Sequence, residues 1–293
     1  MLDLDLSRVG VAPLPASTVI VGRTDSAGQV EVFCVKRHPK SGFLGGAVVF
    51  PGGKVDRGDE DPAWATYRTQ LAARSSVLAE HAAGFAIAAL RETLEEAAIL
   101  PVMGDSLDAS GARSLRQELA AQVSQGGEPG VAFRRLIEQR QLVLDTARLL
   151  PLWRWTTPAA EQRRFETVFY WLELPPHQLG ESDLHETTQG FWGTPGALLE
   201  RWERGDILLA PPTSSSLEVL GELSSLTDVH ALASRYALDP ICPELVFEGN
   251  TTILALPGDV LHSVATPVRG NEDRPTRFVL EAQRFVGRRA PRS

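Results

Sequence analysis

The chain has 293 residues, of which 43% are hydrophobic and 23% charged, as in a folded protein with one large domain or two modest ones. Its formal net charge of −8 argues against a general nucleic-acid binder, because such proteins need a basic surface. Two cysteines are too few for a disulfide framework and no apolar run reaches the roughly 18 residues of a membrane span, so we expect a cytoplasmic protein without a membrane partner.

The first half of the chain mixes strand-like and helix-like segments. The opening MLDLDLSRVG carries two aspartates and lacks the basic-then-apolar layout of a signal peptide. Residues 17–24 and 30–37 are rich in β-branched side chains and predict two strands joined by a turn. The segments that follow are a glycine-rich loop with a short apolar run at 47–50, irregular helix at 61–83, a regular helix at 85–100 and polar helices at 105–140 that QGGEPG interrupts.

The second half continues with both element types. Its predicted strands cover residues 147–155, 167–174, 251–256 and 277–282, with a further strand ending at Phe191 and Trp192, and its predicted helices cover 196–204, 214–223 and 227–236. Strands and helices alternate without a strict βαβ rhythm, which favours a mixed α/β sandwich over a doubly wound sheet. The change in composition near ILLAPPTSSS, residues 207–216, predicts a boundary between residues 206 and 207.

One helix carries an unusual group of charges. In AALRETLEEAAIL, residues 88–100, the side chains of Arg91, Glu92, Glu95 and Glu96 fall within roughly 140° of arc at 100° per residue. A solvated face of an amphipathic helix is one interpretation. However, Glu92 and Glu96 are a like-charge pair four residues apart, and Arg91, placed to reach Glu95, is the only cation in the arc. Clustered carboxylate oxygens are what Mg²⁺ requires, so a bound metal ion is the second interpretation.

Together with FPGGKVDRGD, residues 50–59, this helix resembles the signature of the Nudix hydrolases. In that family a glycine, five residues and a glutamate are followed, after seven more residues, by Arg-Glu-hydrophobic-x-Glu-Glu-x-Gly-hydrophobic. Here Gly53 opens the motif and RETLEEAAI closes it. The resemblance implies a Nudix-type α/β/α sandwich with a mixed sheet in residues 1–206, an insertion at 60–84 inside the motif, and a mostly helical C-terminal extension at 207–293 packed on the core.

The chain departs from the family pattern at several positions. Asp59 stands where the family has its first glutamate, Thr93 replaces an aliphatic residue, and Ala98 replaces a glycine. Residues 60–90 place 31 residues where seven are usual, which is tolerable because loop-closure entropy grows only logarithmically with length. An alanine forced into a left-handed cap costs about 1–2 kcal/mol, so we expect the helix to continue past Ala98. The glycines Gly52 and Gly53 are expected to form a tight turn that meets the glutamate helix.

A branch of the family related to coenzyme A diphosphatases is similar over a longer stretch. That branch has an arginine, a second arginine five residues later, and then Gly-x-x-x-Phe-Pro-Gly-Gly. Arg37 matches the first arginine and GAVVFPGG, residues 46–53, matches the end, whereas Gly42 occupies the place of the second arginine. The resemblance therefore implies Mg²⁺-dependent hydrolysis of a nucleoside diphosphate linked to another moiety, with coenzyme A or acyl-CoA as the first candidate substrate.

The resemblance also implies a role for each matching residue. Glu95 and Glu96 are the main ligands of Mg²⁺ or Mn²⁺, Glu92 is a ligand or the general base, and the Gly53 carbonyl completes the set. Arg91 orients the carboxylates, and Glu186, six residues before Trp192, is a further ligand or general base. Arg37 and Lys54 are candidate phosphate contacts, although both also suit a solvated surface, and Glu186 also suits a plain loop position.

Several alternatives stay open at this point. Trp64 and Tyr67 could stack on an adenine or pack in the core, and Arg163 and Arg164 suit a solvated surface. The runner-up activity is an ADP-ribose or NADH pyrophosphatase, and a third possibility is a Nudix-fold binding module without turnover. We expect a small-molecule diphosphate as the partner, no nucleic acid, and an association into homodimers as an option.

Overall fold

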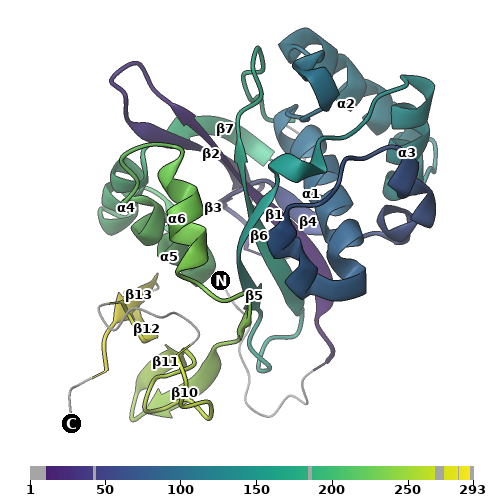
Figure 1. The fold of residues 1–293 in the computed structure, drawn as a ribbon. Coiled ribbons are helices and arrows are strands. Elements are labelled where there is room, and N and C mark those ends of the chain that lie inside the picture. The colour runs from purple at the N-terminus through teal and green to yellow at the C-terminus, as the bar shows by residue number, and fades with distance from the viewer. Residues whose placement is uncertain (1–10, 42–43, 184–186, 268–273, 283, 291–293) are drawn as a thin grey trace.

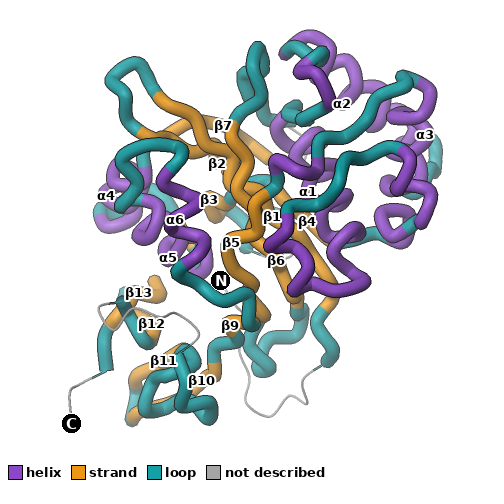
Figure 2. The backbone as a smooth tube through the Cα atoms, viewed as in Figure 1, coloured by secondary structure: helices purple, strands orange, loops and turns teal. Residues whose placement is uncertain are grey.

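A mixed β-sheet forms the middle layer of the protein (Figures 1 and 2). The computed structural model describes residues 11–41, 44–183, 187–267, 274–282 and 284–290. Within them, β1 lies antiparallel to β2 and parallel to β6, so the sheet is mixed as expected. In spatial order its strands are β8 (Leu208–Leu209), β3 (Ala47–Val49), β2 (Val30–Arg37), β1 (Leu14–Thr24), β6 (Phe165–Glu173), β5 (Leu150–Thr156) and β9 (Pro240–Ile241), while β4 (Gly52–Lys54) pairs with β1 and β7 (Thr187–Gly193) pairs with β2.

Helices cover both faces of this sheet (Figure 1). One face carries α1 (Ala82–Ala97), α2 (Ala109–Ser124) and α3 (Pro129–Gln139), and the other carries α4 (Pro195–Glu203), α5 (Pro211–Leu220) and α6 (Asp228–Ser234). Short 3₁₀ helices lie in the connections: η1 (Arg57–Glu60), η2 (Pro62–Thr66), η3 (Ala73–His81), η4 (Met103–Asp105) and η5 (Thr146–Arg148). The arrangement confirms the predicted α/β/α sandwich, including the irregular helix of the insertion.

The two-residue period of the strands explains why both faces are buried. On β1, Val19 and Val21 belong to a first core beneath α1–α3, and Ile20 between them belongs to a second core beneath α4–α6. The neighbouring β6 divides in the same way, with Tyr170 in the first core and Phe169 in the second. Continuous apolar runs in these strands therefore indicate burial on two sides rather than one.

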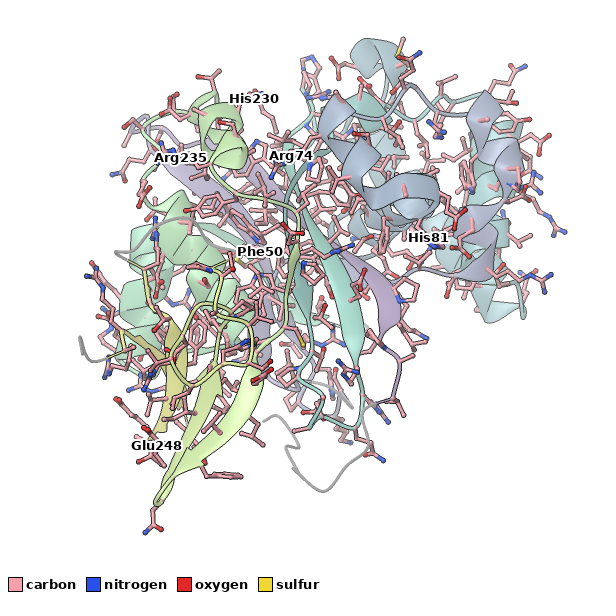
Figure 3. All side chains as sticks on the ribbon, turned by 60° about the horizontal axis from the view of Figure 1, so that its bottom comes forward. Phe50, Arg74, His81, His230, Arg235 and Glu248 are labelled. Atoms are coloured by element: carbon pink, nitrogen blue, oxygen red, sulfur yellow. The ribbon has the colours of Figure 1, made fainter. Side chains whose placement is uncertain are left out.

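The C-terminal extension is half helix and half sheet. After α6, the described residues form a separate four-stranded antiparallel sheet of β10 (Glu244–Glu248), β11 (Thr251–Ala255), β12 (Arg277–Glu281) and β13 (Arg284–Arg288). The expectation of a mostly helical extension is thus wrong beyond residue 234, whereas the late strands predicted at 251–256 and 277–282 are confirmed. Gly249 and Asn250 form a two-residue hairpin turn between β10 and β11, and Glu248, labelled in Figure 3, is the last residue before that turn.

Arg74 ties the insertion to both the sheet and the extension. From η3 its Nε donates to the carbonyl of Pro151 in β5 at 2.8 Å, and its Nη2 donates to the carbonyl of Tyr236 after α6. Burial lowers the pKa of Arg74 from its ordinary value. The residues that interrupt the motif are therefore joined to the rest of the fold by hydrogen bonds as well as by apolar packing.

The structure describes both cysteines of the chain. Cys34 and Cys242 are both free, and burial raises the pKa of the Cys34 thiol to about 12. Within the described ranges, every helix is too short or too polar to traverse a bilayer.

The helix α1 ends sooner than its sequence predicts. It stops at Ala97, and Ala98 adopts the left-handed conformation with φ 51° and ψ 43°. Its N–H donates to the carbonyl of Leu94 at 3.0 Å, which satisfies one of the free carbonyls at the helix end. The expectation that the helix continues past Ala98 is therefore wrong, because capping and the burial of Ile99 and Leu100 outweigh the strain of the turn.

We expect Ala98→Gly to raise the free energy of unfolding by on the order of 1 kcal/mol, because glycine adopts this conformation without the Cβ clash. Thermal unfolding would show a rise in Tm of roughly 2 °C. The matched control is Ala97→Gly, which places the same change inside the helix and should lower stability by about 1 kcal/mol. An Ala98→Gly protein less stable than wild type would contradict the strain assigned here.

Candidate functional site

Arg91 is the centre of a buried ionic cluster on α1. Its side chain is 2% exposed. Its Nε and Nη2 donate to the Asp59 carboxylate at 3.0 and 2.9 Å, and Nη2 also donates to the Lys54 carbonyl at 2.8 Å. Its Nη1 donates to Oε1 of Glu92 at 2.8 Å and lies 3.4 Å from Oε2 of Glu95. One guanidinium therefore joins α1 to β4 and to the turn that contains η1.

The charges of this cluster influence one another strongly. Burial alone would lower the pKa of Arg91, but the carboxylates of Glu92, Asp59 and Glu95 together raise it, so the guanidinium stays charged. Burial raises the pKa of the Asp59 carboxyl, against the opposing effect of its hydrogen bonds from Arg91. Glu96 is 4% exposed. Glu92 and Glu95 are 14% and 30% exposed and both accept from Arg91, so the charged arc of α1 is held by internal partners and is not a freely solvated face.

The two glycines of the motif meet α1, as the sequence predicts. The N–H of Gly52 donates to Oε2 of Glu96 at 3.0 Å. A Cβ on Gly53 would lie 2.3 Å from Oε1 of Glu92, and one on Gly52 would lie 2.3 Å from the Ser17 carbonyl oxygen. Both glycines lie in the short strand β4 and neither has a positive φ. Glycine is therefore needed here for close approach of the backbone, and the expectation of a tight turn is wrong.

Two departures from the Nudix pattern have local explanations. Asp59, which stands in place of a glutamate, has a fully buried carboxylate that accepts from Arg91 and from the backbone N–H of Asp56 at 2.8 Å. Thr93 is 0% exposed, and its hydroxyl donates to the carbonyl of Ala89 one turn earlier at 2.6 Å. Each substituted polar group thus finds a partner inside the fold.

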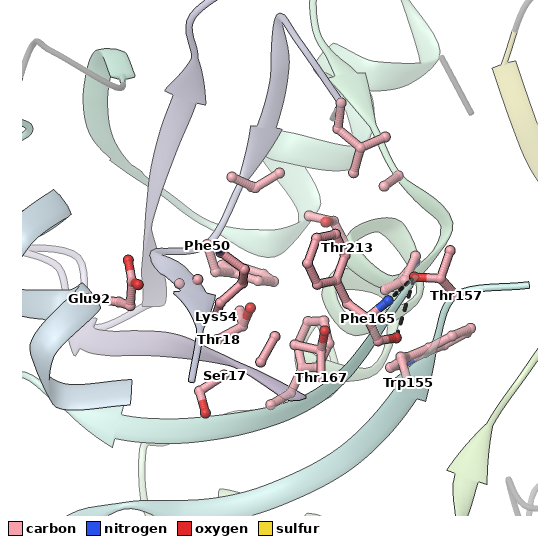
Figure 4. A pocket seen from close by; sticks show the side chains of 18 of the residues that line it. Ser17, Thr18, Phe50, Lys54, Glu92, Trp155, Thr157, Phe165, Thr167 and Thr213 are labelled. Carbon is pink, nitrogen blue, oxygen red and sulfur yellow. Dashed lines mark hydrogen bonds between the residues drawn. The ribbon is translucent and has the colours of Figure 1, made fainter. Parts of the chain in front are cut away.

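A cavity of about 590 Å³ opens beside this cluster, within the size range of small-molecule sites. Its walls include Gly53, Lys54, Glu92 and Glu95, together with Arg37 at the end of β2. Figure 4 shows Glu92 on one side of the cavity and aromatic and threonine side chains on the opposite side, with Phe50, Thr18 and Lys54 between them. The cavity is therefore polar and charged at one end and largely apolar at the other.

The predicted site residues fall into three groups. Those that the structure brings together on the cavity wall are Arg37, Gly53, Lys54, Arg91, Glu92 and Glu95. Glu96 does not line the cavity, and its carboxylate faces the backbone of Gly52. Glu186 lies outside the described residues.

Trp64 and Tyr67 do not line the cavity. Trp64 is 1% exposed, donates from its indole N–H to the Gly58 carbonyl and packs at a tilt against Phe133 in the first core. The Tyr67 hydroxyl donates to Glu138. Of the two interpretations of Trp64 and Tyr67, packing within the fold is the correct one.

The donor chemistry at the charged end suits a divalent cation. Glu92 and Glu95 present carboxylate oxygens on the same wall as Gly53, whose missing Cβ leaves the space that the Glu92 carboxylate occupies. Among the described residues, no three acidic, histidine or cysteine side chains stand in an arrangement ready to hold an ion. Glu92 and Glu95 instead accept from Arg91, and Glu96 accepts from Gly52.

Other cavity residues were not among the predicted site residues. Asp56, 3.6 Å from Nη2 of Arg91, lines the charged end, and its position inside FPGGKVDRGD was the one available signal. The opposite end is built from Trp155 in β5, Phe165 and Phe169 in β6, and residues 210–213 of the extension. Strand alternation places these side chains on one face of the sheet but gives no indication that the face borders a cavity.

We expect Arg91→Lys to destabilise the protein by on the order of 3 kcal/mol, because an ammonium cannot span Asp59, Glu92 and the Lys54 carbonyl at once and leaves buried charge unpaired. Denaturant unfolding gives the free energy directly. Arg204→Lys is the matched control, since Arg204 is 60% exposed in its pair with Asp206 and the same change there should cost less than about 0.5 kcal/mol. An equal loss of unfolding free energy in the two variants would show that Arg91 contributes no more to stability than an exposed arginine does.

Comparison with known proteins agrees with this geometry. Residues 65–220 match the family model of the NUDT19 Nudix domain. The acyl-coenzyme A diphosphatases NUDT19 of Gallus gallus and Homo sapiens are 30% and 25% identical, with alignments that cover 79% and 85% of this chain and 72% and 76% of theirs. A crystal structure of a Nudix hydrolase from Alicyclobacillus acidocaldarius superposes with a TM-score of 0.63 at 26% identity, over 78% of this chain and 99% of that one. The chain therefore belongs to the Nudix hydrolases, in the family defined by the NUDT19 Nudix domain.

Proposed function

We propose that the protein hydrolyses the diphosphate of coenzyme A or an acyl-CoA in the presence of Mg²⁺ or Mn²⁺. The observation that carries the proposal is a cavity that combines a carboxylate wall, the basic side chains of Arg37 and Lys54, and an apolar end. In the reaction, water adds to one phosphorus and the P–O bond of the anhydride breaks. The products are adenosine 3′,5′-bisphosphate and phosphopantetheine, free or acylated.

The charged end has the groups that phosphoryl transfer needs. Glu92 and Glu95, with the Gly53 carbonyl, would hold the cation, and Glu96 is proposed as a further ligand. When bound, Mg²⁺ supplies positive charge against the diphosphate oxygens. Arg91 fixes the orientation of Glu92 and Glu95 through the hydrogen bonds of its Nη1.

The remaining polar groups contribute position and proton transfer. Arg37 and Lys54 line the same cavity and would contact the phosphates, and the buried Nε of Arg37 has no hydrogen-bond partner among the described residues. Glu92 is the proposed general base for the attacking water, and Glu186 is the alternative that the family resemblance suggests. A homodimer and a cytoplasmic location are further proposals that rest on the sequence alone.

The choice of coenzyme A rests on two supports. The NUDT19 relatives are named acyl-coenzyme A diphosphatases. The apolar end of the cavity suits a substrate with an apolar arm beyond its diphosphate, whereas ADP-ribose carries a second polar sugar there. A binding module without turnover has less support, because Arg91, Glu92 and Glu95 of the motif line an open cavity.

Coenzyme A, acetyl-CoA, ADP-ribose and NADH should be compared as substrates of the purified protein with Mg²⁺, with Mn²⁺ and with excess chelator. We expect the two CoA compounds to give the highest kcat/KM and chelator to abolish turnover of all four. Hydrolysis in ¹⁸O-water, followed by mass spectrometry of both products, identifies the phosphorus that is attacked. Preferred turnover of ADP-ribose or NADH would establish the runner-up activity, and binding without turnover would establish a silent module.

Glu96→Gln separates the two roles open to Glu96. The amide oxygen of glutamine can still accept from the Gly52 N–H, so the fold and Tm should be retained. If Glu96 is a metal ligand, kcat falls by at least ~100-fold because the amide is a much poorer ligand. Glu203→Gln, on an exposed face of α4, controls for the loss of one negative charge. An unchanged kcat in Glu96→Gln would restrict Glu96 to positioning β4.

A further inference from the structure

The apolar end of the cavity is built in part by the extension. Pro211, Pro212 and Thr213 at the start of α5 line it, as do Pro243 before β10 and Leu254 in β11. All five lie beyond residue 206, whereas the carboxylates at the other end lie on α1. Two separate parts of the chain thus furnish the opposite ends of one cavity.

The strands of the central sheet supply the rest of this end. Phe165 and Phe169 of β6 and Trp155 of β5 contribute aromatic surface, and Figure 4 shows Phe165, Trp155 and Thr213 grouped opposite Glu92. Thr156, the last residue of β5, also lines the cavity. It is 7% exposed, and its hydroxyl has no hydrogen-bond partner within the part of the chain that the structure describes.

A buried hydroxyl without a partner is costly unless a ligand satisfies it. The surfaces around Thr156 would suit a ligand segment that is mainly apolar and carries an occasional amide or carbonyl. The arm that joins the diphosphate of an acyl-CoA to its acyl group has this chemistry, with two secondary amides and a thioester. A diphosphate placed against the carboxylate end would direct that arm toward Thr156, Phe165 and the extension.

We infer that the extension forms the binding wall for the acylated arm of the substrate, with Pro212 in contact with the acyl chain and the Thr156 hydroxyl bonded to the arm. The inference rests on the proposed function, because it assigns the far end of the same cavity. Each methylene buried against this wall favours binding by about 4-fold. The wall therefore makes kcat/KM rise with acyl length from acetyl-CoA to octanoyl-CoA.

The test is Pro212→Phe, which fills the apolar end. Pro212 is half-buried in the first turn of α5, where no intrahelical hydrogen bond depends on the residue's N–H, so the fold should be preserved. The variant should lower kcat/KM for octanoyl-CoA by about 10-fold or more and for acetyl-CoA by less than about 3-fold. Pro129→Phe is the matched control, since Pro129 opens α3, lines the same cavity and is also half-buried. The Pro129→Phe variant should leave the ratio of kcat/KM for octanoyl-CoA to kcat/KM for acetyl-CoA unchanged.

Thr156→Val supplies a second measurement. It removes the hydroxyl while keeping the shape of the side chain, and it breaks no hydrogen bond within the described chain, so Tm should stay the same or rise. The KM for coenzyme A and its esters should increase about 5-fold as the arm loses its partner. An unchanged KM would remove the Thr156 hydroxyl from the proposal.

The outcomes separate this inference from the proposed function. Wild-type protein that hydrolyses no CoA compound contradicts the proposed function itself. Two results would overturn the assignment of the extension alone. One is a wild-type protein with equal kcat/KM for acetyl-CoA and octanoyl-CoA, and the other is a Pro212→Phe variant that lowers both kcat/KM values by the same factor. A selective loss for octanoyl-CoA in Pro212→Phe, with an unchanged ratio in Pro129→Phe, supports it.

Discussion

The guanidinium of Arg91 is the point at which three separate segments of the chain are held together. It reaches the buried carboxylate of Asp59, the backbone of Lys54 and two glutamates of its own helix. Buried ion pairs contribute little net stability when desolvation is included, but they select one geometry because the alternatives leave charge unpaired. The position of β4 against α1, and with it one wall of the cavity, follows from this selection.

The sheet gives the cavity its two unlike ends. Because β1 and β6 are buried on both faces, one helical layer can carry the carboxylates while the extension contributes to the opposite end. The carboxylates and the cavity residues of the extension therefore come from segments that lie far apart in the sequence. The long insertion does not disturb this arrangement, since Arg74 and the Trp64 packing fasten it to the fold away from the cavity.

Sequence reasoning succeeded where the information is local. The pairing of β1 with β2, most of the helices and the meeting of Gly53 with the glutamate helix follow from periodicity and from the family motif. It failed where the outcome depends on tertiary contacts. Ala98 accepts a strained conformation because its neighbours are buried, and Glu96 turns to the backbone of Gly52. The cavity residues of the extension have no local signal, because their role comes from packing against strands that lie far away in the sequence.

The strand order has a consequence for how the chain reaches its native state. The two ends of the central sheet, β8 and β9, are two-residue strands that both come from the extension, and each pairs in parallel with a strand made much earlier. Short edge strands of this kind protect a sheet from pairing with other molecules. On a ribosome, the long inner strands emerge well before the segments that shield them. During that interval a nascent chain exposes unpaired edges, and chaperone assistance would matter most there.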